Sequence, residues 1–424
     1  MGFTHRLIHI ALTDGTHHSP NNYPIGEYKY VTAKNIKLNG IILEDITYVT
    51  AEVHKEIFSR CNPEFGDILY IKDGATSGIA TINTLHEEFS MLSSVALLKP
   101  AYGIDNWYMC YAMQSPYFYT ITRGNMKGVG ITRITLNMLV SRLIPVPPLQ
   151  EQKQISVKCR ELISLSSNIE NDKEFIRQIL SETKSKILDL AIRGKLVPQD
   201  PNDEPASVLL ERIRAEKEEL IKQGKIKRDK KESVIFKGED NSYYGIHLPD
   251  SWDWASLREI ALSISDGSHN PPPDNGSGIP LLSAANINDN SILMNEISRW
   301  ITNEEWKIEN QRTNIEVGDV LLTIVGSIGR SAVVQNSNHF ALQRSVAVIK
   351  PFLINPLYLM HIVQSPQIQK WLTDNSKGTA QKGIYLNALS LMIIPIPPLA
   401  EQARIVEQIH IAYKQLDLIS NALL

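Results

Sequence analysis

Short apolar runs next to glycine-rich turns recur along the chain. The apolar runs 68–71 and 79–82 flank one such turn, and the run 320–324 precedes another. Apolar runs on either side of a glycine turn predict β-hairpins. A helix is predicted after each hairpin, at 107–114 and 357–364, because each of these segments ends at Ser-Pro. The pattern therefore predicts domains that mix strands with helices, the α+β class.

Two other stretches have the apolar spacing that is typical of long helices. After Pro147 and Pro148, no proline or glycine interrupts the chain up to Ala191, so one continuous helix of roughly 65 Å is predicted. Apolar residues repeat at heptad spacing in this segment and in the C-terminal one: Ile155, Leu162, Ile169 and Ile176, then Ile405, Ile409, Ala412, Leu416, Ile419 and Leu423. This spacing predicts coiled-coil seams between two antiparallel helices that act as a spacer.

The chain contains an internal repeat with a period of about 250 residues. The segment IPVPPLQEQ at 144–152 returns as IPIPPLAEQ at 394–402. Further pairs follow nearly the same offset: IALTDGTHH with IALSISDGSHN, AKNI with AANI, and GDILYIKDGATSG with GDVLLTIVGSIG. Solenoid repeats are only about 20 to 50 residues long, so this period indicates a duplicated domain. The expected fold is two homologous mixed α/β domains separated by long antiparallel coiled-coil helices.

Composition places the chain among ordinary globular proteins. It has 424 residues, of which 43% are hydrophobic and 21% charged, with a formal net charge of -3. No apolar stretch approaches the roughly 18 residues that cross a bilayer, and the N-terminus lacks a secretory cleavage site. A cytoplasmic protein with no membrane contact is therefore expected. The three cysteines have no metal-ligand spacing and fit a reducing compartment, so no metal site is predicted.

Two partial matches to enzyme motifs keep a catalytic alternative open. An NPPP segment approaches the Asn-Pro-Pro-aromatic loop with which amino-methyltransferases hold a flipped base, but proline replaces the aromatic ring. Asp274, Glu305 and Lys307 imitate a metal-dependent nuclease pattern. The segment around Glu305 is instead typical of a capped helix start, with Thr302 or Asn303 as the cap. A stand-alone DNA nuclease or methyltransferase is thus an alternative, while no catalytic residue is predicted.

Neither domain has the net positive charge that is typical of nucleic-acid binders. Residues 1–150 carry 12 basic and 12 acidic side chains, and residues 243–400 carry 10 and 13. This balance argues against DNA binding and keeps a non-DNA coiled-coil scaffold as a further alternative. Basic residues do cluster in two stretches that the repeat aligns: Arg123, Lys127 and Arg133, and Lys377 and Lys382.

Several motifs together resemble the specificity (S) subunit of type I DNA restriction-modification systems. They are the DGTH and DGSH segments, the two GD hairpins, the IPxPPLxEQ start of each long helix, and ILDLAIRGKLVPQDPNDEPASVLLERI. The resemblance covers nearly the whole chain and implies a non-catalytic subunit that reads a split site in double-stranded DNA. It implies four regions: target recognition domain 1 at 1–146, a central conserved region with a long helix and charged tail at 147–242, target recognition domain 2 at 243–396, and a short C-terminal conserved helix at 397–424.

The resemblance also implies partners that carry out the chemistry. Two methyltransferase subunits would dock on the long helices and methylate adenine N6, which they reach by flipping the base. Restriction subunits would add translocation and cleavage. No cofactor is expected in this chain, and S-adenosylmethionine, ATP and magnesium are expected in the partner subunits.

The candidate DNA-binding residues lie in the turns and basic stretches that the repeat aligns. Side chains that project from such turns can reach phosphates and base edges. In the first domain the predicted residues are Thr16, His17, His18, Lys72, Thr76, Ser77, Arg123, Lys127 and Arg133. In the second domain they are Ser268, His269, Asn270, Ser327, Arg330, Lys377, Gln381 and Lys382.

Overall fold

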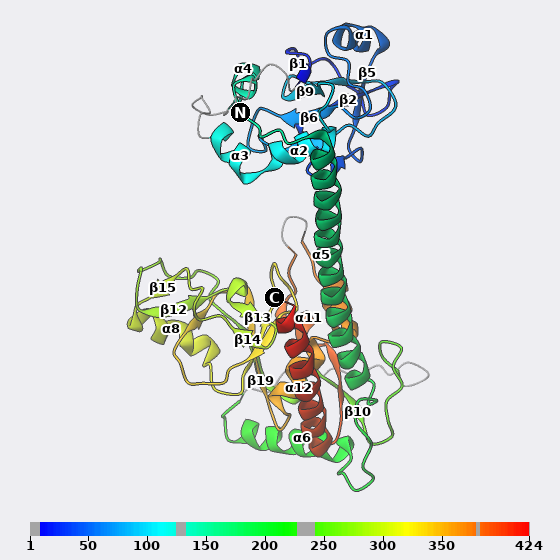
Figure 1. The fold of residues 1–424 in the computed structure, drawn as a ribbon. Helices are drawn as coiled ribbons and strands as arrows, with labels where there is room; N and C mark the ends of the chain where they lie inside the picture. The colour runs from blue at the N-terminus through cyan, green and yellow to red at the C-terminus, as the bar shows by residue number, and fades with distance from the viewer. Residues whose placement is uncertain (1–8, 124–132, 227–241, 379–381, 424) are drawn as a thin grey trace. The chain divides into compact units, whose positions relative to one another are not determined.

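The chain divides into two compact units, residues 1–171 and residues 172–424. Each unit combines strands and helices (Figure 1), which confirms the predicted α+β class. The boundary between the units lies within the longest helix. The computed structural model describes residues 9–123, 133–226, 242–378 and 382–423.

A four-stranded antiparallel sheet forms the centre of the first unit. Its strand order is β1-β9-β6-β7. All four residues of β6 have no exposed surface, as expected for a central strand with both faces covered. The predicted hairpin is confirmed, although its second strand begins at Ala80 rather than at Ile79. The strands are β1 (His9–Asp14), β6 (Ile68–Ile71), β7 (Ala80–Ile82) and β9 (Val95–Pro100).

A smaller sheet and four short helices surround this centre. The smaller sheet has the order β5-β2-β8, in which β8 runs parallel to β2, and a separate β3-β4 hairpin lies near β6 and β7. These strands are β2 (Tyr28–Val31), β3 (Ile36–Lys37), β4 (Gly40–Ile41), β5 (Thr47–Val49) and β8 (Phe89–Met91). The helices are α1 (Ala51–Arg60), α2 (Asn106–Gln114), α3 (Pro116–Arg123) and α4 (Leu136–Val140).

The second unit repeats the topology of the first. Its sheets have the orders β11-β19-β16-β17 and β15-β12-β18, with a β13-β14 hairpin. The first strand of the central sheet has the same irregularity in both units, between His9 and Ala11 and between Ala261 and Ser263. The predicted domain duplication is therefore confirmed down to a local register shift.

The second unit has additional elements at the start of its repeat. A β10-β20 pair joins the segment before the repeat to the segment before the last helix. The strands are β10 (Asp253–Ser256), β11 (Ala261–Asp266), β12 (Ile279–Leu282), β13 (Ile287–Asn288), β14 (Ser291–Ile292), β15 (Trp300–Ile301), β16 (Val320–Thr323), β17 (Ser331–Val333), β18 (Ala341–Leu342), β19 (Val346–Pro351) and β20 (Ile393–Ile396). The helices are α6 (Ala206–Lys222), α7 (Leu257–Ile260), α8 (Asn303–Thr313), α9 (Pro356–Val363), α10 (Pro366–Asp374), α11 (Leu386–Ser390) and α12 (Leu399–Ala422).

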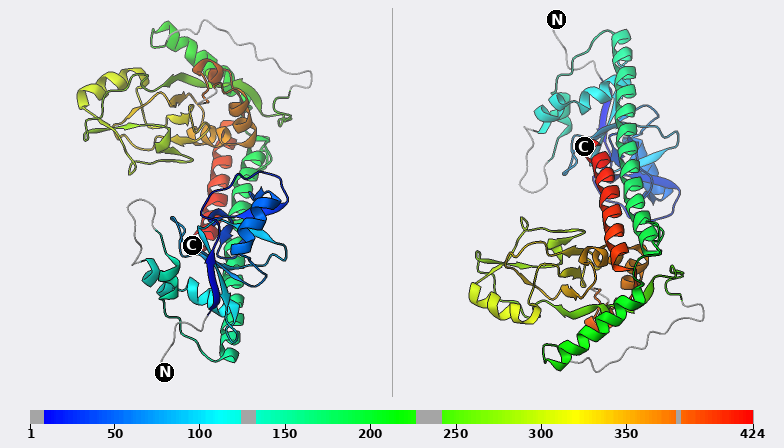
Figure 2. Two further views of the ribbon diagram at one scale, coloured as in Figure 1. Left: turned by 90° about the horizontal axis from the view of Figure 1, so that it is seen from above. Right: turned by 90° about the horizontal axis from the view of Figure 1, so that it is seen from below.

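The long helix predicted after the proline pair is confirmed as α5 (Leu149–Ile192), which has 44 residues. In the second unit, α12 lies antiparallel beside the C-terminal part of α5 (Figures 1 and 2). Lys184 of α5 forms a 2.7 Å ion pair with Asp417 of α12, and its ammonium group lies 5.2 Å from the ring centre of Tyr413. The expected antiparallel pairing is thus present over this part of α5.

The predicted coiled-coil seam is only partly correct. Ile405 and Ile409 of α12 are fully buried, but they belong to the core of the second unit together with Leu188 and Ile192. They are buried because α12 packs on the domain, chiefly against α9, as well as beside α5. In the first unit, two residues of the predicted α5 seam, Leu162 and Ile169, have side chains that are about half exposed. Among the described residues, no helix is both long and apolar enough to cross a membrane.

Candidate nucleic-acid interface

The loop after β1 is fixed by its backbone against the end of β8. Thr16 donates its N–H to the Met91 carbonyl oxygen at 2.9 Å. Gly15 is required beside this contact, because a Cβ there would lie 2.0 Å from the same oxygen. His17 and His18 follow and are exposed. The loop therefore presents both imidazole rings to solvent from a rigid base.

A buried carboxylate beneath this loop holds three basic side chains. Asp14, whose side chain is 5% exposed, accepts a 2.8 Å hydrogen bond from Arg60 at the end of α1. His17 lies 3.3 Å and Lys72 3.5 Å from the same carboxylate. The Arg60 and His17 side chains are 53% and 55% exposed, whereas Lys72 is 10% exposed. Asp14 thus fixes a cluster whose arginine and histidine face solvent.

Two of the residues predicted to project from the first hairpin turn do not project. Lys72 is buried because its ammonium group lies between Asp14 and Asp73, at 3.2 Å from Asp73. Ser77 is 1% exposed, because the turn folds its N–H back onto the Gly74 carbonyl at 3.1 Å. Thr76 is exposed, as predicted.

The basic stretch of the first unit is described only in part. Arg133 is exposed and forms a β-bridge with Asp73, so the structure places it beside the hairpin turn. Arg123 ends α3, but its side chain lies outside the described residues, as does the whole of Lys127. His17, Lys72 and Arg133 are therefore linked through the two aspartates.

The second unit repeats the loop with the same contacts. Ser268 donates its N–H to the Leu342 carbonyl at 2.7 Å, and a Cβ on Gly267 would lie 2.1 Å from that oxygen. Ser268, a candidate for DNA contact in the sequence, is buried by this contact. His269 and Asn270 are exposed, as predicted.

The carboxylate of the second loop has an arginine and a histidine as partners. Asp266, with a side chain 10% exposed, lies 2.8 Å from His269 and forms an ion pair with Arg312 near the end of α8. Arg312 also donates its Nε–H to the Asp266 backbone carbonyl at 2.9 Å. The Arg312 and His269 side chains are 49% and 53% exposed. Asp266 therefore occupies the place of Asp14, and Arg312 that of Arg60.

The second hairpin turn presents basic and hydroxyl groups beside an adjoining segment. Ser327 and Arg330 are exposed, and the Thr323 hydroxyl closes the turn by bonding to the backbone of both residues. Lys382 accepts an N–H from Gly326 at 3.1 Å, and Lys377 pairs with the Gly383 backbone at 2.8 Å. Lys377 and Lys382 are exposed next to this turn, while Gln381 lies outside the described residues.

The structure gives the partial enzyme motifs local structural roles. Thr302 caps α8 as predicted, and Glu305 bonds back to its N–H at 2.8 Å in a capping box. Asp274 accepts the N–H groups of Trp300 and Gly276. The NPPP segment contributes the Pro272 carbonyl, which accepts a hydrogen bond from an arginine. Within the described ranges, no group of three His, Cys, Asp or Glu side chains could hold a metal ion.

The IPxPPLxEQ motif joins each long helix to its domain. The Gln152 side chain accepts the N–H of Asp105, the cap of α2, at 2.9 Å and donates to the Pro147 carbonyl at 2.8 Å. Gln402 makes the same pair of contacts with Asn355, the cap of α9, and with Pro397. Both glutamines are at most 1% exposed, so the motif is a buried structural joint.

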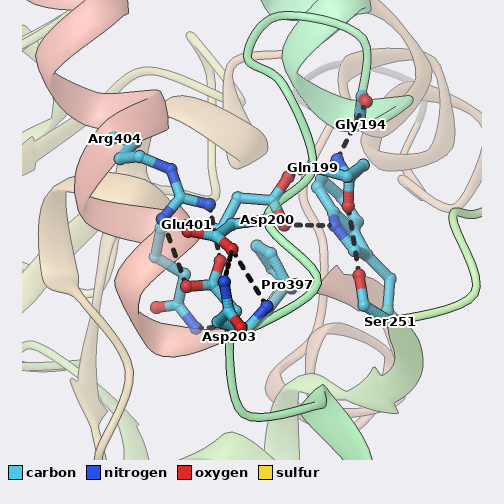
Figure 3. A network of polar contacts seen from close by, with 11 residues as sticks. Gly194, Gln199, Asp200, Asp203, Ser251, Pro397, Glu401 and Arg404 are labelled. Carbon is cyan, nitrogen blue, oxygen red and sulfur yellow. Dashed lines mark hydrogen bonds and ion pairs between the residues drawn. The ribbon is translucent and has the colours of Figure 1, made fainter.

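A polar network ties the start of α12 to the segment that follows α5 (Figure 3). Glu401 accepts hydrogen bonds from Gln199 at 2.6 Å and from the Trp252 indole at 3.0 Å. Burial raises the pKa of the Glu401 carboxyl above its usual value, although both hydrogen bonds oppose this shift. Arg404 forms a two-pronged ion pair with Asp203, with distances of 3.2 and 2.5 Å.

The arginines at the ends of α1 and α8 were not predicted from the sequence. Arg60 and Arg312 lie 46 residues after the Asp of each DG segment, so the repeat itself contained the signal. The aspartates were recognised only as part of a shared motif, because a lone carboxylate in a turn usually acts as a turn residue.

Comparison with known proteins identifies the two units. The family model described as "Type I restriction modification DNA specificity domain" matches residues 14–178 and 249–423. The EcoBI specificity subunit of Escherichia coli is 27% identical over 69% of this chain and 56% of its own length. The EcoAI specificity subunit of Escherichia coli is 35% identical over 54% of this chain and 38% of its own length.

One solved structure extends the likeness in fold along nearly the whole chain. It is a chain from a study of "complex assembly and conformational transition of the type I R-M system", with a TM-score of 0.60 and 17% identity. The match covers 97% of this chain and 92% of that one. The sequence alignments with the two Escherichia coli relatives cover little more than half of the EcoBI subunit and less than half of the EcoAI subunit. Because the family model matches well over half of its residues, the chain belongs to the family of type I restriction-modification DNA specificity domains.

Proposed function

We propose that this chain is the DNA-recognition subunit of a type I restriction-modification complex. In this role each unit reads one half of a two-part site in double-stranded DNA. The observation that carries the proposal is the duplication: two copies of one DNA specificity domain present the same loop and hairpin turn. Two recognition domains on one chain suit a split target.

The proposed role assigns the chemistry to partner subunits. Two methyltransferase subunits bind S-adenosylmethionine and methylate adenine in each half-site, and restriction subunits use ATP and magnesium. Support for this division comes from the similar proteins, which are specificity subunits. In the partial nuclease motif, Glu305 takes part in a helix cap and Asp274 accepts a backbone hydrogen bond in a turn.

The loop and turn residues divide into three groups under this proposal. Exposed residues are candidates for contact with DNA: His17, His18, Thr76, Arg133, His269, Asn270, Ser327, Arg330, Lys377 and Lys382. Thr16, Lys72, Ser77 and Ser268 support the loops from within. Arg123, Lys127 and Gln381 stay predictions from the sequence.

Methylation mapping tests the proposal directly. The chain is co-expressed with the methyltransferase of its own system in a bacterium that lacks adenine methylation, and modified adenines are mapped by single-molecule sequencing. We expect a two-part motif only when both proteins are present.

Each alternative predicts a different result. A stand-alone nuclease or methyltransferase would act on DNA when given magnesium or methyl donor without any partner. A scaffold without DNA specificity would co-purify with the methyltransferase and yield no motif. Either result would overturn the proposal.

A further inference from the structure

The two units share one charged cluster and differ around it. In both, an aspartate at the end of the first central strand holds an arginine from the end of a helix and a histidine from the adjoining loop. Where two recognition domains read half-sites that differ in sequence, the contacts that both domains share cannot be the ones that tell the half-sites apart. Contacts to phosphates fix position without reading sequence, whereas contacts to base edges specify it.

We propose that Arg60 with His17, and Arg312 with His269, are duplicated anchors for the DNA phosphate backbone, each fixed by its buried aspartate. The proposal rests on the DNA-recognition role of the chain. It assigns no base reading to these four residues.

The geometry of the clusters supports anchoring rather than a purely internal ion pair. The carboxylates are 5% and 10% exposed, but the arginine and histidine side chains are all about half exposed. A guanidinium has five N–H donors; Arg60 uses its Nη2 group for Asp14, and Arg312 uses its Nε and Nη2 groups for Asp266. Donors therefore remain for an anion that approaches from solvent, and charge-assisted bonds to phosphate are among the strongest.

The loop backbone beneath each cluster is held in place in the same way in both units. Gly15 and Gly267 allow the loop backbone to contact the end of the neighbouring strand at a distance that a Cβ would forbid. Thr16 and Ser268 then make equivalent backbone hydrogen bonds. A histidine held this way needs little ordering when it binds, which lowers the entropic cost of the contact.

The surrounding positions differ between the units, as base-reading positions should. Lys72 lies in the first cluster, whereas Ile324 occupies the equivalent position in the second unit and is buried. Arg133 pairs with Asp73 in the first unit, and Gly383 pairs with Val325 in the second. We assign sequence discrimination to exposed positions that differ between the units, such as Arg133, and not to the shared cluster.

The test removes both partners of the ion pair, so that no buried carboxylate loses its arginine, and in the first unit Lys72 keeps its contact with Asp73. The double variant Asp266→Asn with Arg312→Gln, and its counterpart Asp14→Asn with Arg60→Gln, are made in the chain co-expressed with its methyltransferase. Duplex DNA binding is measured against salt concentration, and methylated motifs are mapped. We expect affinity for all sequences to fall about tenfold per cluster, the salt slope to fall by about 0.9 per lost phosphate contact, and the motif to stay the same.

Matched controls lie on the same two helices. Lys55 of α1 and Lys307 of α8 are exposed and stand five residues before each arginine. Lys55→Gln and Lys307→Gln remove one charge each outside the clusters and should change the slope less. Thermal unfolding checks that every variant folds.

A purely structural cluster gives a distinguishable outcome. If the folded double variants keep the affinity and salt slope of the parent, or if the motif itself changes, the anchor is wrong. Should the double variants fail to fold, His17→Ala and His269→Ala replace them, because these side chains are half exposed; unaltered affinity would then refute the anchor. Absence of any two-part motif with the parent chain would instead refute the proposed function.

Discussion

At the scale of single residues, Glu401 shows how one motif position acquires two different environments. In the second unit its carboxylate is 1% exposed and accepts hydrogen bonds from Gln199 and Trp252. The repeat counterpart, Glu151, is exposed on α5. Burial raises the pKa of the Glu401 carboxyl above 4.5, its usual value. A carboxyl of this kind favours folding in its protonated form, so its contribution to stability declines as pH rises above 4.5.

The replacement Glu401→Gln should therefore change how stability depends on pH. The amide cannot ionise, so the parent chain is expected to lose stability relative to the variant as pH rises from below 4.5 towards neutrality. Thermal unfolding of both proteins across this range measures the difference. Glu151→Gln removes the exposed repeat counterpart and is the matched control. A difference between parent and Glu401→Gln that stays constant with pH would contradict the shift.

The sequence located the candidate loops better than it placed their side chains. The Asp-Gly-Thr-His and Asp-Gly-Ser-His segments were recognised, and His17 and His269 are exposed as expected. Lys72 was expected to project, but two aspartates close in space draw its ammonium group inward. Arg60 was missed because its partner, Asp14, is 46 residues away and only the folded chain brings them together.

At the scale of elements, a buried glutamine defines each joint between a domain and its long helix. Gln152 bonds to the backbone of Asp105, Gly103 and Pro147 and is 1% exposed. These bonds connect the cap of α2 to the first turn of α5. The motif was predicted as a helix start from its proline pair, but its glutamine had no assigned role, because its partners are backbone groups that have no sequence signal.

Removing this side chain should loosen the joint. Gln152→Ala leaves the Asp105 N–H without the acceptor that the buried Gln152 side chain provides, which costs about 1–3 kcal/mol. The first unit should unfold at lower temperature, and amides at the start of α2 should exchange faster with solvent. Gln154→Ala, on the same turn of α5 and exposed, is the matched control. Equal exchange rates in the two variants would show that the joint does not depend on Gln152.

The elements themselves followed the sequence closely where their signals were local. The helices predicted at 107–114 and 357–364 appear within one residue as α2 and α9. Predicting the partners of the heptad positions required more than periodicity. Ile405 and Ile409 satisfy a coiled-coil pattern, yet they are buried in a domain core, since one apolar stripe can pack on either surface.

At the scale of the whole molecule, α5 has an apolar stripe in the first unit that the described chain leaves open. Leu162 and Ile169 are 54% and 48% exposed. Ile155 and Cys159, two turns and one turn before Leu162, line an apolar hollow of about 620 Å³ together with α2 and α3. In the second unit, Ile405 and Ile409, which are the repeat counterparts of Ile155 and Cys159, are fully buried. An exposed apolar stripe that continues into a hollow is typical of a protein interaction site. Under the proposed function, a methyltransferase subunit is expected to dock here.

Charged substitutions on this stripe should disrupt assembly with the partner without affecting folding of the chain. The double variant Leu162→Lys with Ile169→Lys places two ammonium groups in the proposed interface, so co-purification with the methyltransferase should be lost. Its unfolding temperature should change little, because substitutions of exposed side chains usually alter stability by about 0.5 kcal/mol or less. Asn168→Lys adds a charge on the same exposed part of α5 and should keep the partner if docking depends on the apolar stripe. Retention of the methyltransferase by the folded double variant would show that the subunit docks elsewhere on the chain.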